Sequence, residues 1–181
     1  MFIPLILGTA REGRRSESAA RFILEEVKKA GLETTLLDVR DYRVPATNNT
    51  ETIPEALKLS AVIEKADGFI IVSPEYNHGY PGELKMFLDL LYDQWAKRPV
   101  GLCGVSIGPF GGARMVEQLR QVVAELHMVS IREVLYFPTI IKLLDESGGI
   151  KDPSAYAERI KKFLDELRFY AEALKLQREK R

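Results

Sequence analysis

A stiff polar loop lies near the middle of the sequence, in the segment SPEYNHGYPGELK at residues 73–85. Each of its two prolines fixes one backbone torsion angle and removes an N–H donor. Its two glycines permit a close backbone approach that a side chain would block. We therefore expect the loop to offer its own N–H and C=O groups to a flat heterocyclic ligand, with the side chains of Tyr76 and His78 beside the ring. For His78 alone, a plain surface position is the alternative.

A second group of candidate ligands lies in GTAREGRRSES, at residues 8–18, directly after an apolar run. The segment holds three arginines and three hydroxyl side chains just before a predicted helix. Unpaired N–H groups at a helix N-terminus attract anions, and guanidinium and hydroxyl groups strengthen the attraction. The pattern is neither GxGxxG nor a P-loop, because Gly13 is not followed by Lys and Ser or Thr. An ordinary helix cap with solvated arginines is the alternative, but this density of groups favours a phosphate monoester.

A third loop, SIGPFGGARM at residues 106–115, is rich in glycine: Gly108, Gly111 and Gly112 surround Phe110. A backbone of this kind can approach a ligand closely and direct N–H groups at it. A flexible loop without a ligand is the alternative. We favour the ligand, because the carboxyl ends of parallel strands meet at one edge of a sheet and would bring all three loops together there.

Five apolar runs and five helical patterns alternate along the chain and would position these loops. Most of the runs are nearly continuous, which is typical of strands buried on both faces of a parallel sheet. The runs occupy residues 2–7, 34–39, 68–73, 100–107 and 130–137, and the helical patterns residues 18–30, 53–66, 82–95, 113–126 and 156–176. The alternation predicts an α/β fold, a three-layer sandwich with helices on both faces of a five-stranded parallel sheet in the flavodoxin-like order 2-1-3-4-5. The length predicts a single domain, residues 1–181.

The predicted helix from Gly82 to Trp95 is apolar on more than one side. A helix that is apolar nearly all round is buried nearly all round. A helix in the outer layer of a small α/β domain has one face left over. We therefore expect that face to contact another subunit, so that the chain forms a homodimer or homotetramer through this helix. Coverage of the face by the C-terminal helix is the alternative.

The composition excludes several classes of protein. The 26 basic residues equal the 26 acidic residues, which argues against a nucleic-acid partner and against a strongly acidic carrier. The single cysteine, Cys103, cannot form an internal disulfide and reads as a small core residue. The two histidines, His78 and His127, do not have metal-ligand spacing, so we expect no metal. The apolar N-terminus is too short to span a membrane and lacks a basic flank, so a cytoplasmic location without a membrane partner is expected.

The three loops together resemble those of the NAD(P)H-dependent FMN reductases, a flavodoxin-like family that includes azoreductases, quinone reductases and chromate reductases. The likeness runs from the first strand to the fifth. SPEYNHGYPGELK is similar to the family's P-E-Y-N loop and its continuation, GPFGGAR is similar to its glycine loop, and GTAREGRRSES matches its phosphate loop more loosely. Met86 departs from the family, in which Asn often follows the lysine, and we expect this difference to affect subunit packing rather than flavin binding.

This resemblance implies an FMN-dependent oxidoreductase. NAD(P)H would deliver hydride to flavin N5 beside Tyr76, Asn77 and His78 and then leave, and a quinone, azo compound, flavin or metal oxyanion would take its place in a ping-pong reaction. The protein would contribute orientation and electrostatics, and no side chain need act as a general acid or base. The implied FMN contacts are Thr9, Arg11, Arg15, Ser16 and Ser18 at the phosphate, Pro74, Glu75, Tyr76 and Asn77 at one edge of the ring, through backbone hydrogen bonds near N5 and O4, and Ser106, Gly108, Gly111 and Gly112 at its pyrimidine side.

A flavodoxin that carries single electrons is the alternative function, although such carriers are typically acidic and this chain has no net charge. A receiver domain would need acidic residues where the first strand ends in Gly-Thr-Ala-Arg, and an esterase would need a G-x-S-x-G motif. The sequence leaves open the physiological acceptor, the choice between NADH and NADPH, dimer or tetramer, and the role of the loop from Pro138 to Asp152. We consider the 2′-phosphate of NADPH as a partner for Arg14 if the FMN phosphate does not need it.

Overall fold

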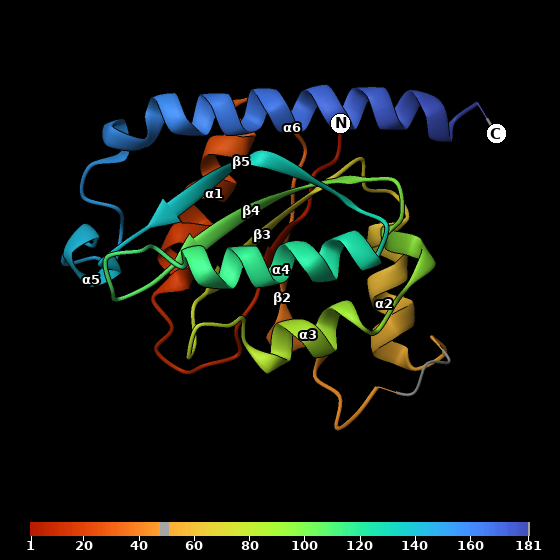
Figure 1. The fold of residues 1–181 in the computed structure, drawn as a ribbon, viewed down its shortest axis with the longest axis horizontal. Coiled ribbons are helices and arrows are strands. Elements are labelled where there is room, and N and C mark those ends of the chain that lie inside the picture. Colours follow the sequence, from red (N-terminus) through yellow and green to blue (C-terminus); the bar gives the residue numbers. More distant parts are fainter. Residues whose placement is uncertain (48–50, 181) are drawn as a thin grey trace.

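A five-stranded parallel sheet forms the centre of the protein, for which the computed structural model describes residues 1–47 and 51–180. The strands lie in the order β2-β1-β3-β4-β5, which confirms the predicted arrangement (Figure 1). The three interior strands, β1, β3 and β4, are buried along their whole length, which explains their continuous apolar runs. The strands are β1 (Leu5–Leu7), β2 (Leu36–Asp38), β3 (Phe69–Pro74), β4 (Pro99–Val105) and β5 (Val129–Phe137).

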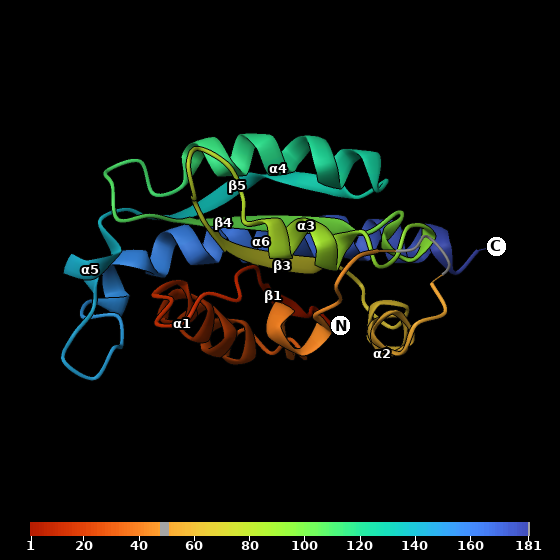
Figure 2. The ribbon, with the colours of Figure 1, turned by 90° about the horizontal axis from the view of Figure 1, so that it is seen from below.

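Helices cover both faces of the sheet. Alternate strand residues point to opposite sides, and the apolar side chains on each side are covered by helices. Ile6 and Ile71 belong to one buried cluster, together with residues of α2, α3 and α4, whereas Leu5 and Ile70 belong to a second cluster with α1 and α6. In Figure 1, α6 runs along one side of the sheet and α3 and α4 along the other, and Figure 2 shows α3 in front of the strands and α6 behind them. The helices are α1 (Ser16–Lys29), α2 (Pro54–Ile63), α3 (Gly82–Leu88), α4 (Ala113–Glu125), α5 (Ile140–Leu143) and α6 (Ala157–Arg178).

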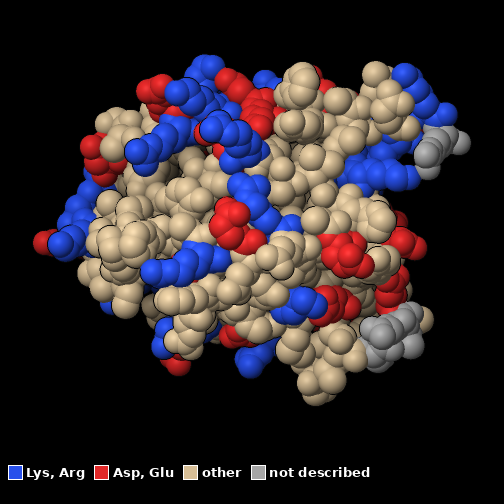
Figure 3. Space-filling view, viewed as in Figure 1, with Lys and Arg blue, Asp and Glu red and all other residues tan. Residues whose placement is uncertain are grey.

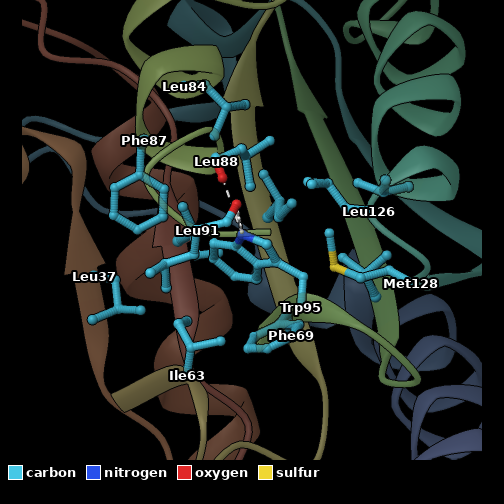
Figure 4. Close-up of a cluster of buried hydrophobic side chains, with 14 of the residues drawn as sticks. Leu37, Ile63, Phe69, Leu84, Phe87, Leu88, Leu91, Trp95, Leu126 and Met128 are labelled. Atoms are coloured by element: carbon cyan, nitrogen blue, oxygen red, sulfur yellow. Dashed lines mark hydrogen bonds between the residues drawn. The ribbon is translucent and has the colours of Figure 1, made fainter. Parts of the chain in front are cut away.

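The segment from Gly82 to Trp95 is not the single helix that we expected. Helix α3 ends at Leu88, and a separate 3₁₀ helix (Asp93–Trp95) follows. The indole of Trp95 enters the core and donates from Nε1 to the carbonyl groups of Leu88 at 3.0 Å and Leu91 at 3.2 Å (Figure 4). The chain bends between the two pieces, so apolar residues that would surround a straight helix all reach one core. Those buried to an exposure of 4% or less are Leu84, Phe87, Leu88, Leu90, Leu91 and Trp95.

This burial removes the apolar face on which the expected subunit contact was based. Of the described residues in the segment, Tyr92 is the large hydrophobic side chain that stays exposed, at 46%. The alternative, coverage by the C-terminal helix, does not apply either, because α6 packs on the other face of the sheet. A homodimer or homotetramer stays a prediction, now without support from this segment.

Several smaller differences concern the ends of elements. The sequence did not predict the 3₁₀ helices Val39–Tyr42 and Pro153–Tyr156 or the short helix α5, which forms directly after β5. His127 lies beyond the end of α4 with a φ of 57°. Within residues 1–47 and 51–180, no helix combines the length and the apolar composition required to cross a membrane.

Candidate functional site

A cleft of about 360 Å³ lies at the carboxyl ends of β1, β3 and β4. This is where open parallel sheets bind their ligands. Figure 1 shows the loops after these strands gathered at the same end of the sheet, at the left of the view. The cleft is lined by Arg11, Glu12, Gly13, Arg14, Arg15, Ser16, Pro74, Glu75, Tyr76, Val105, Ser106, Ile107 and Ile140.

The N-terminus of α1 forms one wall of the cleft. Arg15 occupies the N-cap position, and no side chain caps the helix. The Oγ of Ser16 is buried and has no hydrogen-bond partner among the described residues. Buried polar atoms are normally satisfied, so an orphaned hydroxyl at the open start of a 14-residue helix is suited to bind an anionic oxygen. The exposed side chains of Arg11 and Arg15 add positive charge beside it.

Arg14, in contrast, is held inside the protein. Its side chain is 3% exposed and donates to the carbonyl of Thr9 and to the carboxylates of Asp38 and Glu17. Burial alone would lower the pKa of Arg14, but the two carboxylates raise it above its ordinary value. Burial alone would raise the pKa of Asp38, but hydrogen bonds from Arg14 and from the N–H of Arg40 lower it. The hypothesis that Arg14 binds the 2′-phosphate of NADPH is therefore wrong for this structure, because its guanidinium is engaged elsewhere.

The loop after β3 is closed by a two-residue turn that the sequence did not reveal. The N–H of Tyr76 donates to the carbonyl of Gly79, and the N–H of Gly79 donates back to Tyr76, both at 2.9 Å. The two residues between them, Asn77 and His78, have positive φ angles of 50° and 72°. Such a turn requires this conformation at both central positions. Non-glycine residues adopt it at an energetic cost, and they concentrate at functional sites.

This turn limits which N–H groups can reach a ligand. The N–H of Glu75 donates to the carbonyl of Val105 at 2.9 Å, and that of Tyr76 is used within the turn. The N–H of Asn77 has no acceptor in the part of the chain that the structure describes. In this structure the N–H groups of Glu75 and Tyr76 are therefore engaged within the protein, and Asn77 has the N–H that stays free for a ring edge, so the predicted backbone contacts of this loop stay a prediction.

Tyr76 connects the loop after β3 to the loop after β1, residues 8–15, which we call the arginine loop. The hydroxyl of Tyr76 lies 3.1 Å from Oγ1 of Thr9, and the guanidinium of Arg11 lies over its ring at 5.1 Å. Thr9 is fully buried, and its Oγ1 also accepts from the N–H of Arg11. Thr9 thus supports the cleft from behind, and Tyr76 belongs to the cleft wall instead of standing free to flank a ring. His78 is exposed at the tip of the turn.

The loop after β4 packs so closely against its own strand that glycine is required. A Cβ atom on Gly104 would lie 2.4 Å from the carbonyl oxygen of Gly111, which itself has a φ of 62°. The Oγ of Ser106 donates to the carbonyl of Gly108 at 2.9 Å and fixes the start of the loop. The N–H of Ile140 donates to the carbonyl of Ser106 at 3.0 Å, which brings the segment after β5 into the cleft wall.

An ion pair joins the loops after β3 and β4. Nη1 of Arg114 lies 3.0 Å from Oε1 of Glu75, and the same guanidinium lies 4.8 Å from the ring centre of Phe110. The side chain of Glu75 is 10% exposed, and its other oxygen, Oε2, is buried without a partner among the described residues. The donor group of a bound ligand would satisfy this oxygen.

The structure brings together only part of the ligand set that the sequence predicted. The residues that line the cleft are Arg11, Arg15, Ser16, Pro74, Glu75, Tyr76 and Ser106. Those outside the lining are Thr9, Asn77, His78, Gly108, Gly111 and Gly112, which belong to the same three loops, and Ser18. Ser18 lies toward Gly148 and lines a different depression, between α1 and the segment 147–150.

Sequence reasoning also missed residues that line the cleft. One of them is Ile140, which follows β5 and comes from the loop region whose role was left open. The rule that strand ends carry the site would have found it if it had been applied to the fifth strand as well. The structure shows no group of three or more His, Cys, Asp or Glu side chains placed to hold a metal ion within residues 1–47 and 51–180.

Comparisons with known proteins found a family model, curated relatives and solved structures that are similar to this chain. A family model described as NADPH-dependent FMN reductase matches residues 1–141. A quinone reductase of Escherichia coli K12 is 32% identical over 158 residues, which cover 81% of this chain and 83% of the relative. An NAD(P)H-dependent FMN reductase of Saccharomyces cerevisiae is 28% identical over 147 residues, 71% of this chain and 76% of the relative. A flavoenzyme NAD(P)H:(acceptor) oxidoreductase from Paracoccus denitrificans has the same fold, with a TM-score of 0.78, 23% identity and coverage of 93% and 98%.

Proposed function

Because the chain belongs to the NADPH-dependent FMN reductase family, we propose that it oxidises NAD(P)H and passes the electrons through bound FMN to a small acceptor. The acceptors that we propose are quinones, azo compounds, flavins and metal oxyanions, with quinones first because a 32%-identical relative is named a quinone reductase. The order of reaction that we propose is ping-pong, with nicotinamide and acceptor using one site in turn.

The orphaned hydroxyl of Ser16 is the observation that carries this proposal. It lies in the cleft at the uncapped N-terminus of α1, beside two exposed guanidinium groups. A phosphate oxygen would satisfy the hydroxyl and the free N–H groups of the first helical turn together. We propose that Arg11, Arg15 and Ser16 contact the FMN phosphate directly and that Thr9 supports them from behind. Ser18 is no longer part of the proposed set, because it lines a different depression.

The remaining cleft residues would hold and shield the ring system. FMN, when bound, supplies the hydride acceptance from nicotinamide and the subsequent electron donation to the acceptor. Pro74, Val105 and Ile140 contribute apolar wall that excludes water, and the N–H of Asn77 donates to the ring edge. The closed turn at residues 76–79 keeps this donor in one position, which a reaction between two bound reactants requires. For the pyrimidine side, we propose the backbone of residues 106–112.

A single-electron carrier of the flavodoxin type shares this fold but fits the surface less well. The solved flavodoxin of Streptococcus pneumoniae has a TM-score of 0.59 at 15% identity, which shows the fold alone. Carriers steer toward protein partners with a surface of one charge. This chain has no net charge, and Figure 3 shows basic and acidic side chains intermingled on the face in view.

Three measurements on the purified full chain test the proposal. We expect the protein to retain FMN after desalting, with the yellow absorbance of a flavoprotein. We expect it to oxidise NADH or NADPH with a quinone as acceptor, and double-reciprocal plots at several quinone concentrations to be parallel, as a ping-pong reaction requires. A protein that binds no FMN would contradict the proposal. Stable accumulation of one-electron-reduced flavin in a redox titration would favour the carrier instead.

A further inference from the structure

We propose that Asp38 is a positioning residue for the arginine loop: through Arg14 and Arg40 it fixes the peptide groups that give this loop its selectivity for the flavin phosphate. The proposal rests on the proposed function, because it assumes that the loop binds the phosphate of FMN. It assigns a role to a carboxylate that is absent from the cleft lining and belongs to the neighbouring strand β2.

Guanidinium groups hold three consecutive carbonyl groups of the arginine loop. Arg14 donates to the carbonyl of Thr9 at 2.5 Å. Arg40 donates to the carbonyls of Ala10 at 3.1 Å and Arg11 at 2.5 Å. In a trans peptide, the carbonyl group and the N–H group of the following residue point in opposite directions. Fixing three carbonyls therefore fixes the direction of the N–H groups of the next residues. The N–H of Arg11 is used within the loop, by Oγ1 of Thr9, so the N–H groups of Ala10 and Glu12 are the ones left for a ligand.

Asp38 joins the two arginines that do this. Its Oδ1 accepts from Nη1 of Arg14 at 2.7 Å and from the backbone N–H of Arg40 at 3.0 Å, and its Oδ2 accepts from Nη2 of Arg14. Asp38 is the last residue of β2 and caps the 3₁₀ helix that carries Arg40. One carboxylate on a strand of the sheet therefore holds the guanidinium of Arg14 directly and the backbone from which the side chain of Arg40 extends.

The direction of these peptide groups decides whether the loop attracts or repels an anion. A loop binds an anion when its N–H groups point toward the anion and its carbonyl groups point away. Arg11, Glu12 and Gly13 line the cleft, so a rotated peptide in this stretch would present a carbonyl oxygen where the phosphate binds. The carbonyls that the network holds lie at the phosphate end of the cleft. The loops after β3 and β4, which form the ring end, receive none of these guanidinium hydrogen bonds and meet the arginine loop through side-chain contacts of Tyr76 with Thr9 and Arg11, so we expect the ring end to change much less.

The substitution Asp38→Asn separates positioning from simple electrostatics, because the two predict opposite signs. Removal of a negative charge near a phosphate site would tighten FMN binding if charge alone mattered. Loss of the charge-assisted hydrogen bonds that hold Arg14 and Arg40 weakens FMN binding if Asp38 positions the loop. Riboflavin, which has the ring but no phosphate, reports on the ring end alone.

The experiment titrates the full-length apoprotein with FMN and, separately, with riboflavin, using the quenching of flavin fluorescence. We expect Asp38→Asn to weaken FMN binding by about tenfold or more, the equivalent of one lost charge-assisted hydrogen bond, and to change riboflavin binding less than about twofold. Arg40→Lys keeps the charge but loses the planar fork that spans two carbonyls, so we expect the same selective loss. The control Asp41→Asn removes an exposed carboxylate three residues along the chain and should change neither affinity.

Each outcome decides a particular claim. Unchanged or tighter FMN binding by Asp38→Asn, or an equal loss for FMN and riboflavin, would overturn the positioning role. If Asp38→Asn does not fold by circular dichroism, Arg40→Lys decides, and retention of the wild-type preference for FMN overturns the role. A wild-type protein that binds FMN no better than riboflavin would overturn the proposed phosphate site itself, which is a separate failure.

Discussion

At the residue scale, the polar groups around the cleft fall into two kinds. Ser16 and Glu75 each keep a buried oxygen without a partner among the described residues. Thr9 and Arg14 are equally buried, but their polar atoms are fully occupied by other parts of the protein. Under the proposed function, groups of the first kind would face the ligand, whereas groups of the second kind hold the loops in place.

The substitution Ser16→Ala should therefore have opposite effects on binding and on stability. We expect FMN binding to weaken by about tenfold, because one hydrogen bond to a charged oxygen is lost. We expect the thermal midpoint of the apoprotein to stay the same or rise slightly, because a buried hydroxyl without a partner is removed. Fluorescence titration and thermal unfolding of the apoprotein measure the two effects.

Ser18→Ala provides the matched control, because it makes the same chemical change on the same helix. It should leave FMN binding unchanged, since Ser18 lies in the other depression. Equal losses of affinity from Ser16→Ala and Ser18→Ala would mean that the phosphate does not bind where we place it.

Cys103 should be chemically silent in the folded protein. It is fully buried in β4, and burial raises the pKa of its thiol, so the reactive thiolate is not formed at neutral pH. We expect no reaction with a thiol reagent such as dithionitrobenzoate until denaturant is added, and no loss of NAD(P)H oxidation during the incubation. Rapid labelling of the native protein would show that β4 opens far more readily than its burial implies.

The sequence could identify the residue types at this site but could not assign their roles. Arg14 and Arg15 are adjacent and chemically identical, yet one is 3% exposed inside the protein and the other lies exposed at the cleft. The difference comes from Asp38, which is distant in the sequence and becomes a neighbour only when β2 pairs with β1. Likewise, the composition of the loop after β3 predicted stiffness, but the turn that uses up the N–H of Tyr76 depends on bonds that no local pattern specifies.

At the element scale, substitutions in β4 can distinguish effects on stability from effects on FMN binding, because its two glycines face opposite sides of the sheet. A Cβ atom on Gly101 would lie 2.3 Å from the ring of Phe163 in α6, and one on Gly104 would lie 2.4 Å from the backbone of Gly111. We expect Gly101→Ala and Gly104→Ala each to lower the free energy of unfolding by about 1–3 kcal/mol, through overpacking. Only Gly104→Ala should also weaken FMN binding, because it displaces the loop after β4.

Urea unfolding and FMN titration of the two variants test this separation. Gly82→Ala serves as a control for the substitution itself, since a Cβ atom there would meet no protein atom within 4 Å. A comparable loss of FMN affinity in Gly101→Ala would indicate that general loosening of the sheet, and not the position of the loop, controls binding.

The wrong prediction of a single helix from Gly82 to Trp95 also concerns the element scale. Most apolar residues of this segment were correctly predicted to be buried, with Tyr92 as an exception, but burial on several sides was taken as a sign of a second subunit. The structure achieves the same burial within one chain, because the helix stops at Leu88 and Trp95 folds back to donate to its carbonyl. Hydrophobic periodicity alone does not distinguish a straight helix with a partner from a bent segment without one.

At the scale of the whole molecule, the two ends of the parallel strands have different functions. The cleft lies at the carboxyl ends of the strands. At the opposite edge, the buried carboxylate of Asp67 accepts from the N–H of Phe2 at 3.0 Å and pairs with Lys175 of α6 at 3.1 Å. Phe2 near the start of the chain and Lys175 of α6 are thus held at the end of the sheet opposite the cleft. The strand order β2-β1-β3-β4-β5 could be predicted from the sequence, because the alternation of strands and helices and the right-handed crossover rule leave few possible topologies.

Acid should remove the stabilisation that Asp38 provides. Its pKa in the folded protein is below the ordinary value of 3.8, so its contribution is complete above that value and is lost as the pH falls through the lowered pKa. We expect the difference in free energy of unfolding between the wild type and Asp38→Asn to be constant near neutral pH and to shrink below about pH 4. Urea unfolding at several pH values measures this difference. A constant difference down to the acid transition would show that the charge of Asp38 does not matter for folding.

The most direct test of the account is a crystal structure of the full chain grown with FMN. The account predicts the phosphate within hydrogen-bonding distance of Oγ of Ser16 at the start of α1, and the ring system between the loops after β3 and β4, with the N–H of Asn77 at its edge. A flavin whose phosphate lies elsewhere, for example in the depression beside Ser18 and Gly148, would contradict it.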